Sequence, residues 1–265
     1  MNKLEKNFAG LRKQKKKAFI VFITAGDPTE KRTIELARVL AESGADVIEL
    51  GLPFSDPLAD GPTIQKAGER ALSGGMNTDR YFSLTARIGR ELDVPLVCLT
   101  YYNIILQYGL EKFAQSCRKN GVSGVIVPDL PVEEAGPFLS SCRKSKVNLI
   151  FLVSETTTGG RIKKILSKAS GFVYAVAILG TTGARDRVSG KLRGLIRRVK
   201  SKTRLPVAVG FGISRPEHAR EVLSYGADAV IVGSAIVKKI EGSLKEERKM
   251  LSRVRSFADS MRKAI

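Results

Sequence analysis

The chain has 265 residues, of which 43% are hydrophobic, and its formal net charge is +19. This length can bury one full core, either in a barrel of eight β/α units or in a doubly wound α/β domain. No apolar run approaches the roughly 20 residues needed to span a bilayer. The polar start from Met1 to Lys17 and the short apolar run from Ala18 to Thr24 do not make a secretory signal. We therefore expect a cytoplasmic protein.

Three cysteines and a single histidine limit the metal and disulfide chemistry. Cys98, Cys117 and Cys142 are odd in number and widely spaced, which argues against a disulfide framework or a CxxC metal site. His218 follows Pro216 in a charged, helical context, so we expect a histidine on a helix surface. The sequence predicts neither a metal site nor a catalytic triad that depends on histidine.

The positive charge is distributed over four segments: Arg12 to Lys17, Arg161 to Lys168, Lys191 to Lys202 and Lys245 to Lys263. Three of the four also carry apolar residues at helical spacing, so we expect their cations to form the solvated faces of helices. A nucleic-acid partner is not expected, because no recognition motif or basic strip interleaved with aromatic residues is present. An anionic substrate or an acidic partner would also suit this charge.

Short apolar runs alternate with segments of helical periodicity along the chain. The eight runs expected as strands are Phe19–Ile23, Val47–Leu50, Pro95–Leu99, Gly124–Val127, Asn148–Val153, Phe172–Val176, Pro206–Val209 and Ala229–Val232. Additional helices are expected at Asn2 to Leu11, at Thr63 to Leu72, from Ser234, and at the end of the chain. A related frame at 44–51 and 226–233 indicates repeated units. The pattern predicts a (β/α)8 TIM barrel with a capping N-terminal helix and extra helices after strands two and eight, in one domain spanning 1–265.

In such a barrel the active site lies where the strands end and their loops begin. Glu49 falls at this position in a run of Val, Ile and Leu, where an unpaired buried carboxylate would cost several kcal/mol. Apolar surroundings would raise the pKa of Glu49 and suit it to proton transfer. No lysine lies on a predicted strand, which disfavours an aldolase that forms a Schiff base.

Other carboxylates follow the predicted strands. Asp56 and Asp60 lie in the Pro/Gly/Asp-rich loop after Glu49, and either could be only a turn residue. Asp129 follows the fourth strand and could face a substrate or cap a loop.

Glycine-rich loops follow the sixth, seventh and eighth strands, at 180–183, 210–214 and 233–235. Any one of them could be only a tight turn. Three such loops at the same end of the barrel favour a phosphate site formed by backbone N–H groups. A short helix beginning at Ser234 would direct its positive end toward the anion.

Several of these segments resemble the tryptophan synthase alpha subunit family, and the resemblance covers essentially the whole chain. The matching segments are Thr24 to Pro28, Glu49 to Pro62, Tyr101 to Asn103, Val127 to Pro131, Gly210 to Ser214 and Gly233 to Val237. The resemblance implies a lyase that splits indole-3-glycerol phosphate into indole and glyceraldehyde 3-phosphate in tryptophan biosynthesis.

The same resemblance implies roles for individual residues. Glu49 matches the catalytic acid and base, and Asp60 matches the carboxylate that holds the indole N–H. The positions that match substrate contacts are Phe22, Leu99, Tyr101, Asp129, Tyr174 and Phe211, with Thr182 as the lid residue. The positions that match the phosphate cradle are Gly183, Gly212, Gly233 and Ser234.

The resemblance also implies a partner, a PLP-dependent β subunit in an αββα tetramer, and no cofactor in this chain. The expected partner contacts are Pro53, Asp56, Asn103 and Pro131. The chain departs from the family pattern at three places: Ile104 where many members have proline, the polar loop Ser154 to Gly160, and Ala177 to Leu179 before the lid.

Three alternatives remain at this point. One is a lyase that works without a β subunit. Another is an isomerase or synthase among the phosphate-binding barrels of histidine and tryptophan biosynthesis, which the pair Glu49 and Asp60 disfavours. The last is a basic barrel that binds nucleic acid, for which binding would depend steeply on salt.

Overall fold

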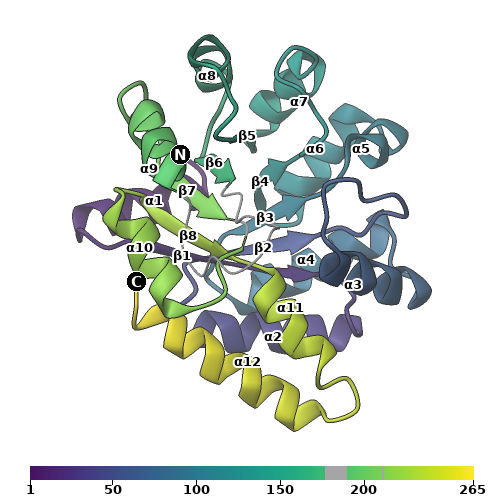
Figure 1. Ribbon diagram of the computed structural model, residues 1–265. Helices are drawn as coiled ribbons and strands as arrows, with labels where there is room; N and C mark the ends of the chain where they lie inside the picture. The colour runs from purple at the N-terminus through teal and green to yellow at the C-terminus, as the bar shows by residue number, and fades with distance from the viewer. Residues whose placement is uncertain (177–189, 211) are drawn as a thin grey trace.

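The computed structural model describes residues 1–176, 190–210 and 212–265, which form a closed barrel of parallel strands arranged in chain order (Figure 1). The strands are β1 (Ala18–Thr24), β2 (Val47–Gly51), β3 (Leu96–Leu99), β4 (Val122–Ile126), β5 (Asn148–Val153), β6 (Val173–Val176), β7 (Val207–Gly210) and β8 (Ala229–Val232). Strand β1 pairs with both β2 and β8, which closes the barrel. The predicted (β/α)8 barrel is confirmed, and each predicted strand overlaps an observed one.

The strands are apolar on both faces because a parallel barrel is covered inside and out. All seven residues of β1 are buried. Ile20 belongs to the cluster that fills the barrel interior, whereas Phe19 and Val21 belong to the layer between strands and helices. This double burial explains why the strands are visible in the sequence as short, continuous apolar runs.

Helices surround the barrel (Figure 1). They are α1 (Lys3–Lys13), α2 (Glu30–Glu42), α3 (Pro62–Ser73), α4 (Thr78–Glu91), α5 (Tyr102–Tyr108), α6 (Leu110–Lys119), α7 (Gly136–Ser145), α8 (Gly159–Leu166), α9 (Gly190–Lys200), α10 (Pro216–Ser224), α11 (Ser234–Glu241) and α12 (Glu247–Arg262). The expected additional helices correspond to α1, α3, α11 and α12. Helices α4 and α5 have no predicted counterpart, and α5 buries only Ile105, too little for a helical pattern to be recognised.

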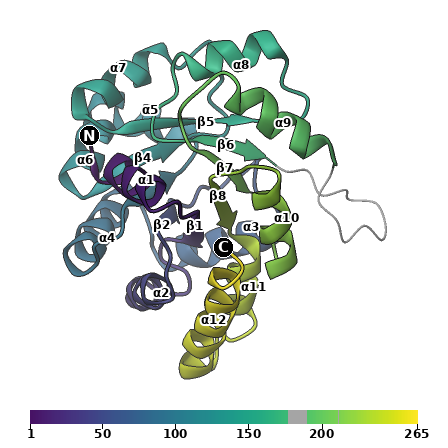
Figure 2. The ribbon, with the colours of Figure 1, turned by 90° about the vertical axis from the view of Figure 1, so that its left-hand side faces the viewer.

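Helix α1 closes the end of the barrel where the strands begin (Figure 2). Leu4 and Phe8 are buried among the interior residues, and the rings of Phe8 and Phe172 lie 5.7 Å apart. Asn2 caps the helix by accepting the Glu5 N–H at 3.1 Å, and its side chain donates to the Ser123 carbonyl at 2.8 Å. One end of the barrel is therefore sealed, which leaves the carboxyl ends of the strands as the place for a site.

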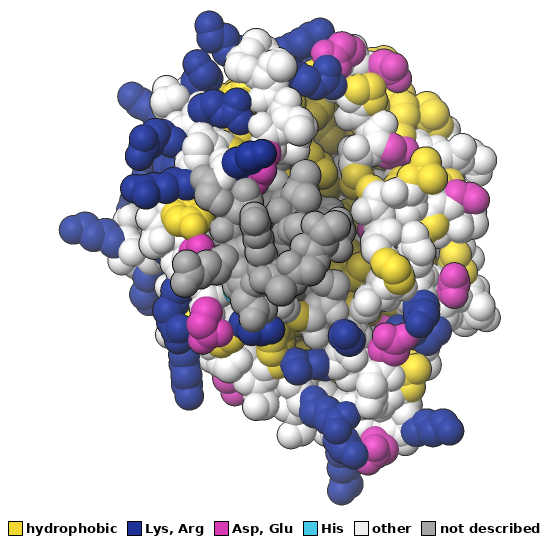
Figure 3. All heavy atoms as spheres, in the orientation of Figure 1, with side chains coloured by type: hydrophobic (Ala, Val, Ile, Leu, Met, Phe, Trp, Pro, Cys, Tyr) yellow, Lys and Arg dark blue, Asp and Glu magenta, His cyan; other side chains and the backbone are white. Residues whose placement is uncertain are grey.

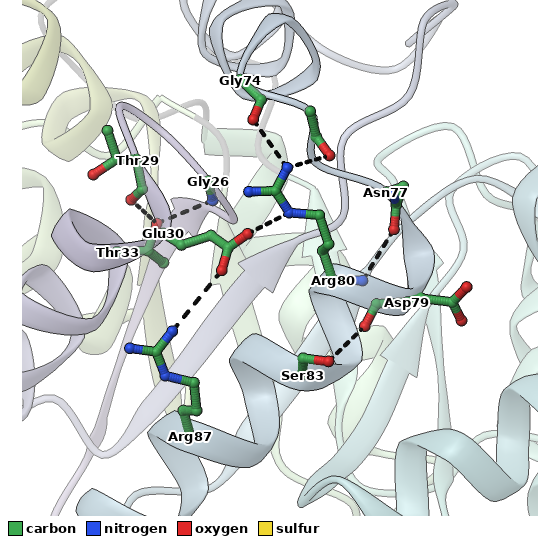
Figure 4. Close-up of polar contacts among 11 residues, drawn as sticks. Gly26, Thr29, Glu30, Thr33, Gly74, Asn77, Asp79, Arg80, Ser83 and Arg87 are labelled. Carbon is green, nitrogen blue, oxygen red and sulfur yellow. Dashed lines mark hydrogen bonds and ion pairs between the residues drawn. The ribbon is translucent and has the colours of Figure 1, made fainter.

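Polar contacts anchor the connection between α3 and α4 to α2 (Figure 4). Arg80 Nε donates to Glu30 Oε1 at 2.6 Å, and Arg80 Nη1 donates to the carbonyls of Gly74 and Gly75 at 3.1 and 2.8 Å. Arg87 Nη1 lies 3.9 Å from Glu30 Oε2. One arginine therefore fixes the end of α3, whose first turn borders the cavity described below.

The expected surface position of His218 is wrong. This residue lies on α10 as expected, but it is only 7% exposed, and its Nδ1 accepts the Ser214 N–H at 3.4 Å. A helical side chain leans toward the turn before its own Cα, which brings the imidazole onto the loop that leads into α10.

Among the described helices, none has both the length and the apolar character needed to cross a membrane.

Candidate active site

Glu49 lies in β2 and directs its side chain into the barrel, while its chain neighbours Ile48 and Leu50 face the helices. The side chain is 1% exposed, and its Oε2 atom has no hydrogen-bond partner among the described residues. Burial, and secondarily the charge of Asp60, raises the pKa of Glu49 to about 8. At neutral pH the group therefore holds a proton that it can donate.

Asp60 is the second carboxylate of the site and lies in the loop between β2 and α3. Burial raises the pKa of Asp60, and a hydrogen bond from Tyr101 opposes this shift. The Tyr101 hydroxyl also accepts the Ala59 N–H at 3.1 Å, so it is held between the loop and the end of β3. Tyr101 thus favours the ionised form of Asp60, and the two carboxylates differ in environment as separate acid and base roles require.

A cavity of about 320 Å³ opens at the carboxyl ends of the strands, and both carboxylates line it. It is lined by Phe22, Glu49, Asp60, Gly61, Pro62, Thr63, Ile64, Leu99, Tyr174, Gly212, Ile213, Ile231, Gly233 and Ser234. Ile213, Ile231 and the first turn of α3 are part of this site although the sequence pattern did not predict them there. The helix expected directly after Asp60 was the one signal that could have located that turn.

Glycines make room for the aromatic walls of this cavity. A Cβ atom added to Gly210 would overlap the Tyr174 phenol, 2.7 Å from its Cζ atom. A Cβ atom added to Gly51 would lie 2.8 Å from the Phe22 ring, and one added to Gly233 would lie 3.2 Å from Phe22 Cβ. The positions of Phe22 and Tyr174 therefore depend on neighbours that carry no side chain.

We expect Gly210→Ala to lower the activity of this site by about 10²-fold, because the methyl group would displace Tyr174 from the cavity wall and misplace a bound substrate. Steady-state kinetics would measure this loss. Gly194→Ala on α9 is the matched control, since a Cβ atom there has nothing within 4 Å. Activity equal to that of the control variant would show that the Tyr174 wall does not position the substrate.

The far side of the cavity carries features suited to an anion. Gly212 has a φ of +77°, and Gly233 is the N-cap of α11 without a side-chain hydrogen bond. The N–H groups of Ser234 and Ala235 in the first turn have no partner among the described residues, so they can bind an anion at the positive end of the helix. The predicted residues Thr182, Gly183 and Phe211 lie outside the described residues, as do Ala177 to Leu179.

Asp129 lies outside the cavity lining. It is exposed, and its two carboxylate oxygens accept the Tyr102 N–H at 3.0 and 3.1 Å at the start of α5. Of the two roles left open for Asp129, this geometry favours the loop cap over a direct substrate contact. Tyr101 borders a second, smaller cavity of about 20 Å³ together with Asp60.

The four residues expected to contact a partner differ in exposure. Asp56 and Asn103 are exposed and Pro131 is half-buried. Pro53 is buried and lines the small cavity behind Asp60, so in the isolated chain it supports the loop from inside rather than facing solvent.

Within the described ranges, no cluster of three His, Cys, Asp or Glu residues could hold a metal ion, and the three cysteines are buried free thiols.

A closed barrel with two dissimilar carboxylates in a cavity at the ends of its strands defines a (β/α)8-barrel enzyme with acid-base chemistry. A family model described as tryptophan synthase alpha chain matches residues 8–265. The chain belongs to the tryptophan synthase alpha chain family, and its reaction is the cleavage of indole-3-glycerol phosphate in tryptophan biosynthesis.

Individual relatives agree with this membership. The chain is 50% identical to the tryptophan synthase alpha chain of Methanosarcina barkeri over 263 residues, which cover 99% of this chain and 97% of that one. It is also similar to the crystal structure of the alpha subunit from Legionella pneumophila, with a TM-score of 0.92, 37% identity, and coverage of 100% and 98% of the two chains. A chain from the α2β2 complex of Pyrococcus furiosus matches with a TM-score of 0.86 and 38% identity, over 92% of this chain and 97% of that one.

Proposed function

We propose that Glu49 and Asp60 are the acid-base pair that splits indole-3-glycerol phosphate into indole and glyceraldehyde 3-phosphate. The observation that carries this proposal is the raised pKa of Glu49, about 8, beside a cavity shared with Asp60. A carboxyl group that is protonated at neutral pH can act as a general acid, and a second carboxylate can stabilise positive charge on the substrate.

The proposed reaction is a retro-aldol cleavage. It consumes no water, and the steps below use only the substrate and the two carboxyl groups. Glu49 donates a proton to indole C3, and Asp60 accepts a hydrogen bond from the indole N–H as positive charge spreads over the ring. The bond between C3 and the glycerol chain then breaks, and its electron pair restores the aromatic indole. The hydroxyl next to the broken bond loses its proton to the Glu49 carboxylate and becomes the aldehyde of glyceraldehyde 3-phosphate.

We place the indole ring between Phe22, Leu99 and Tyr174, which line the same cavity as the two carboxylates. The phosphate would bind the start of α11, at Gly233 and Ser234, with Gly212 beside it. This arrangement is supported by the N–H groups of Ser234 and Ala235, which have no partner in the part of the chain that the structure describes. The proposed lid role of Thr182 and the proposed contacts of Gly183 and Phe211 rest on the family resemblance alone.

The proposed partner is a β subunit that carries PLP and receives the indole in an αββα assembly, with residues 1–265 of this chain acting as one domain. A solved relative forms an α2β2 complex. Leu58, after β2, is 92% exposed, and Leu106, on α5, is 52% exposed, close in sequence to Asp56 and Asn103. Large apolar side chains exposed in this way are typical of a surface that a partner covers.

The assay that tests this function is cleavage of indole-3-glycerol phosphate by the purified chain, alone and with a β subunit. We expect indole release in both cases and a higher rate in the complex, because closure of the site excludes water. Equal rates would support a lyase that works alone. No indole release in either case would contradict the proposed function.

A further inference from the structure

A third cavity, larger than the two described above, lies at the end of the barrel opposite Glu49. Its volume is about 1080 Å³, and it lies between the end of α1 and the segments that lead into β1, β6, β7 and β8. Gly171, Pro206 and Asp228 line it just before three of these strands begin. We call this cavity the floor groove. It has no role in the cleavage reaction, since helix α1 and the interior residues separate it from the carboxylates.

The floor groove has a large excess of positive charge. Its lining includes all five cations between Arg12 and Lys17, together with Lys200 and Arg204. Among the described residues, Glu5 and Asp228 are the carboxylates in this lining. This excess concentrates part of the net charge of +19 in one concave place. Such a cavity focuses an attractive field on anions.

The two carboxylates of the floor groove are already engaged. Glu5 accepts hydrogen bonds from the Asn2 N–H and from Asn148 Nδ2, both at 2.9 Å. Asp228 accepts the Val207 N–H at 3.0 Å and lies 2.7 Å from Lys200 Nζ. It also lies 3.7 Å from Lys17 Nζ.

Five cations of the floor groove form no ion pair with a carboxylate within the described residues: Arg12, Lys13, Lys15, Lys16 and Arg204. Burial raises the pKa of Asp46 and the charge of Lys16 opposes this rise, which sets Lys16 apart from the other four. Arg12 and Lys13 lie in the last turn of α1, where the helix dipole favours cations. That effect does not account for Arg204, or for Lys15, which is held at a φ of +56° in the left-handed region that lysine disfavours. A ligand with several negative charges would neutralise all four.

We propose that the floor groove binds a chain of phosphates, either free polyphosphate or the triphosphate of a nucleotide. Lys and Arg side chains that converge on a concave site match closely spaced phosphate oxygens. Leu11, Leu205 and Pro206 give the groove an apolar wall on which the base of a nucleotide could rest. Phe8 is the one aromatic residue among the described residues of the lining, and it is only 7% exposed. These residues therefore provide no stacking platform for single-stranded nucleic acid.

The outer face of α8 and α9 provides a matched control. Segments 159–176 and 190–210 hold eleven Lys and Arg residues and no Asp or Glu, and Figure 3 shows cations crowded over these helices. Lys163, Arg193 and Arg197 are exposed there and do not line the groove, and neither does Lys144 on α7. Changing these four to glutamine removes the same charge as changing Arg12, Lys13, Lys15 and Arg204 to glutamine.

Isothermal titration of both fourfold variants and the original chain, with tripolyphosphate and with ATP in the absence of magnesium, tests the proposal. We expect the groove variant to bind about tenfold more weakly or worse, the control variant to bind normally, and both to keep full lyase activity. Tighter binding of ATP than of tripolyphosphate would identify a nucleotide as the ligand, and equal binding would identify the phosphate chain alone.

Three results would overturn the proposal. They are no binding of either probe by the original chain, equal weakening by the two variants, and equal binding of sulfate and tripolyphosphate at matched ionic strength. Tight binding of duplex RNA that both variants weaken equally would instead assign the charge to a nucleic-acid surface over the whole basic side of the molecule. Thermal unfolding of each variant checks that the barrel is intact, which separates loss of the groove from loss of the fold.

Discussion

Glu49→Gln lowers the rate of indole release from indole-3-glycerol phosphate by about 10²- to 10⁴-fold, the range expected when a general acid is removed. Glutamine has nearly the shape of the protonated glutamic acid that occupies this buried position at neutral pH, so the barrel should still form. The loss should appear in kcat rather than in substrate binding, because the proton is transferred only in the reaction. Steady-state kinetics and substrate titration would measure the two separately.

The same variant should also change how stability depends on pH. A carboxyl group whose pKa rises from 4.5 in the unfolded chain to about 8 in the folded one stabilises the fold below pH 4.5. It loses that contribution as the pH rises toward 8, because the unfolded chain releases its proton first. The contribution lost is on the order of 5 kcal/mol. Denaturant unfolding across this pH range should therefore show a smaller decline for Glu49→Gln than for the original chain.

Two results would contradict these expectations for Glu49. Turnover close to that of the original chain would remove it from the proposed mechanism. Parallel stability curves for the two proteins between pH 4.5 and 8 would show that the folded chain does not hold this proton more tightly than the unfolded chain.

Asp60→Asn is expected to reduce turnover by about 10²- to 10³-fold, a loss typical of removing one electrostatic stabiliser of a transition state. Asparagine keeps the shape of the side chain but cannot balance the positive charge that develops on the indole nitrogen. Asp56→Asn is the matched control, because Asp56 lies in the same loop and is exposed. Kinetics of both variants, measured for the isolated chain, would compare them without a partner.

The comparison separates chemistry from loop structure. If both variants lose activity to the same extent, the loop as a whole and not the charge of Asp60 is responsible. If neither loses activity, the proposed contact with the indole N–H is absent.

Most of the barrel could be predicted because each strand is buried on both faces and therefore stands out as a short apolar run. The burial of Glu49 could be predicted because this carboxylate interrupts such an apolar run. The order of strands follows from the alternation of strands and helices, since parallel neighbours need a helical crossover. These features depend on the chain locally and need no knowledge of long-range contacts.

The missed features depend on where loops bring side chains in three dimensions. Three examples are the burial of His218, the burial of Pro53, and the contact between Asp129 and the start of α5. In each case the residue contacts another part of the chain, and no local sequence pattern predicts that contact. The floor groove is a further example. The basic segment Arg12 to Lys17 was visible as charge, but its meeting with Lys200 and Arg204 depends on closure of the barrel.

The glycines opposite Phe22 and Tyr174 have a consequence for engineering the substrate range. The cavity is bounded by two large rings that each rest against a position without a side chain, so its size is set by the rings and not by the path of the backbone. Shortening either ring would enlarge the space while leaving the strands in place, and a bulkier indole could then enter. Adding bulk at the glycines would close the same space, which makes Gly51, Gly210 and Gly233 poor positions for variation and Phe22 and Tyr174 good ones.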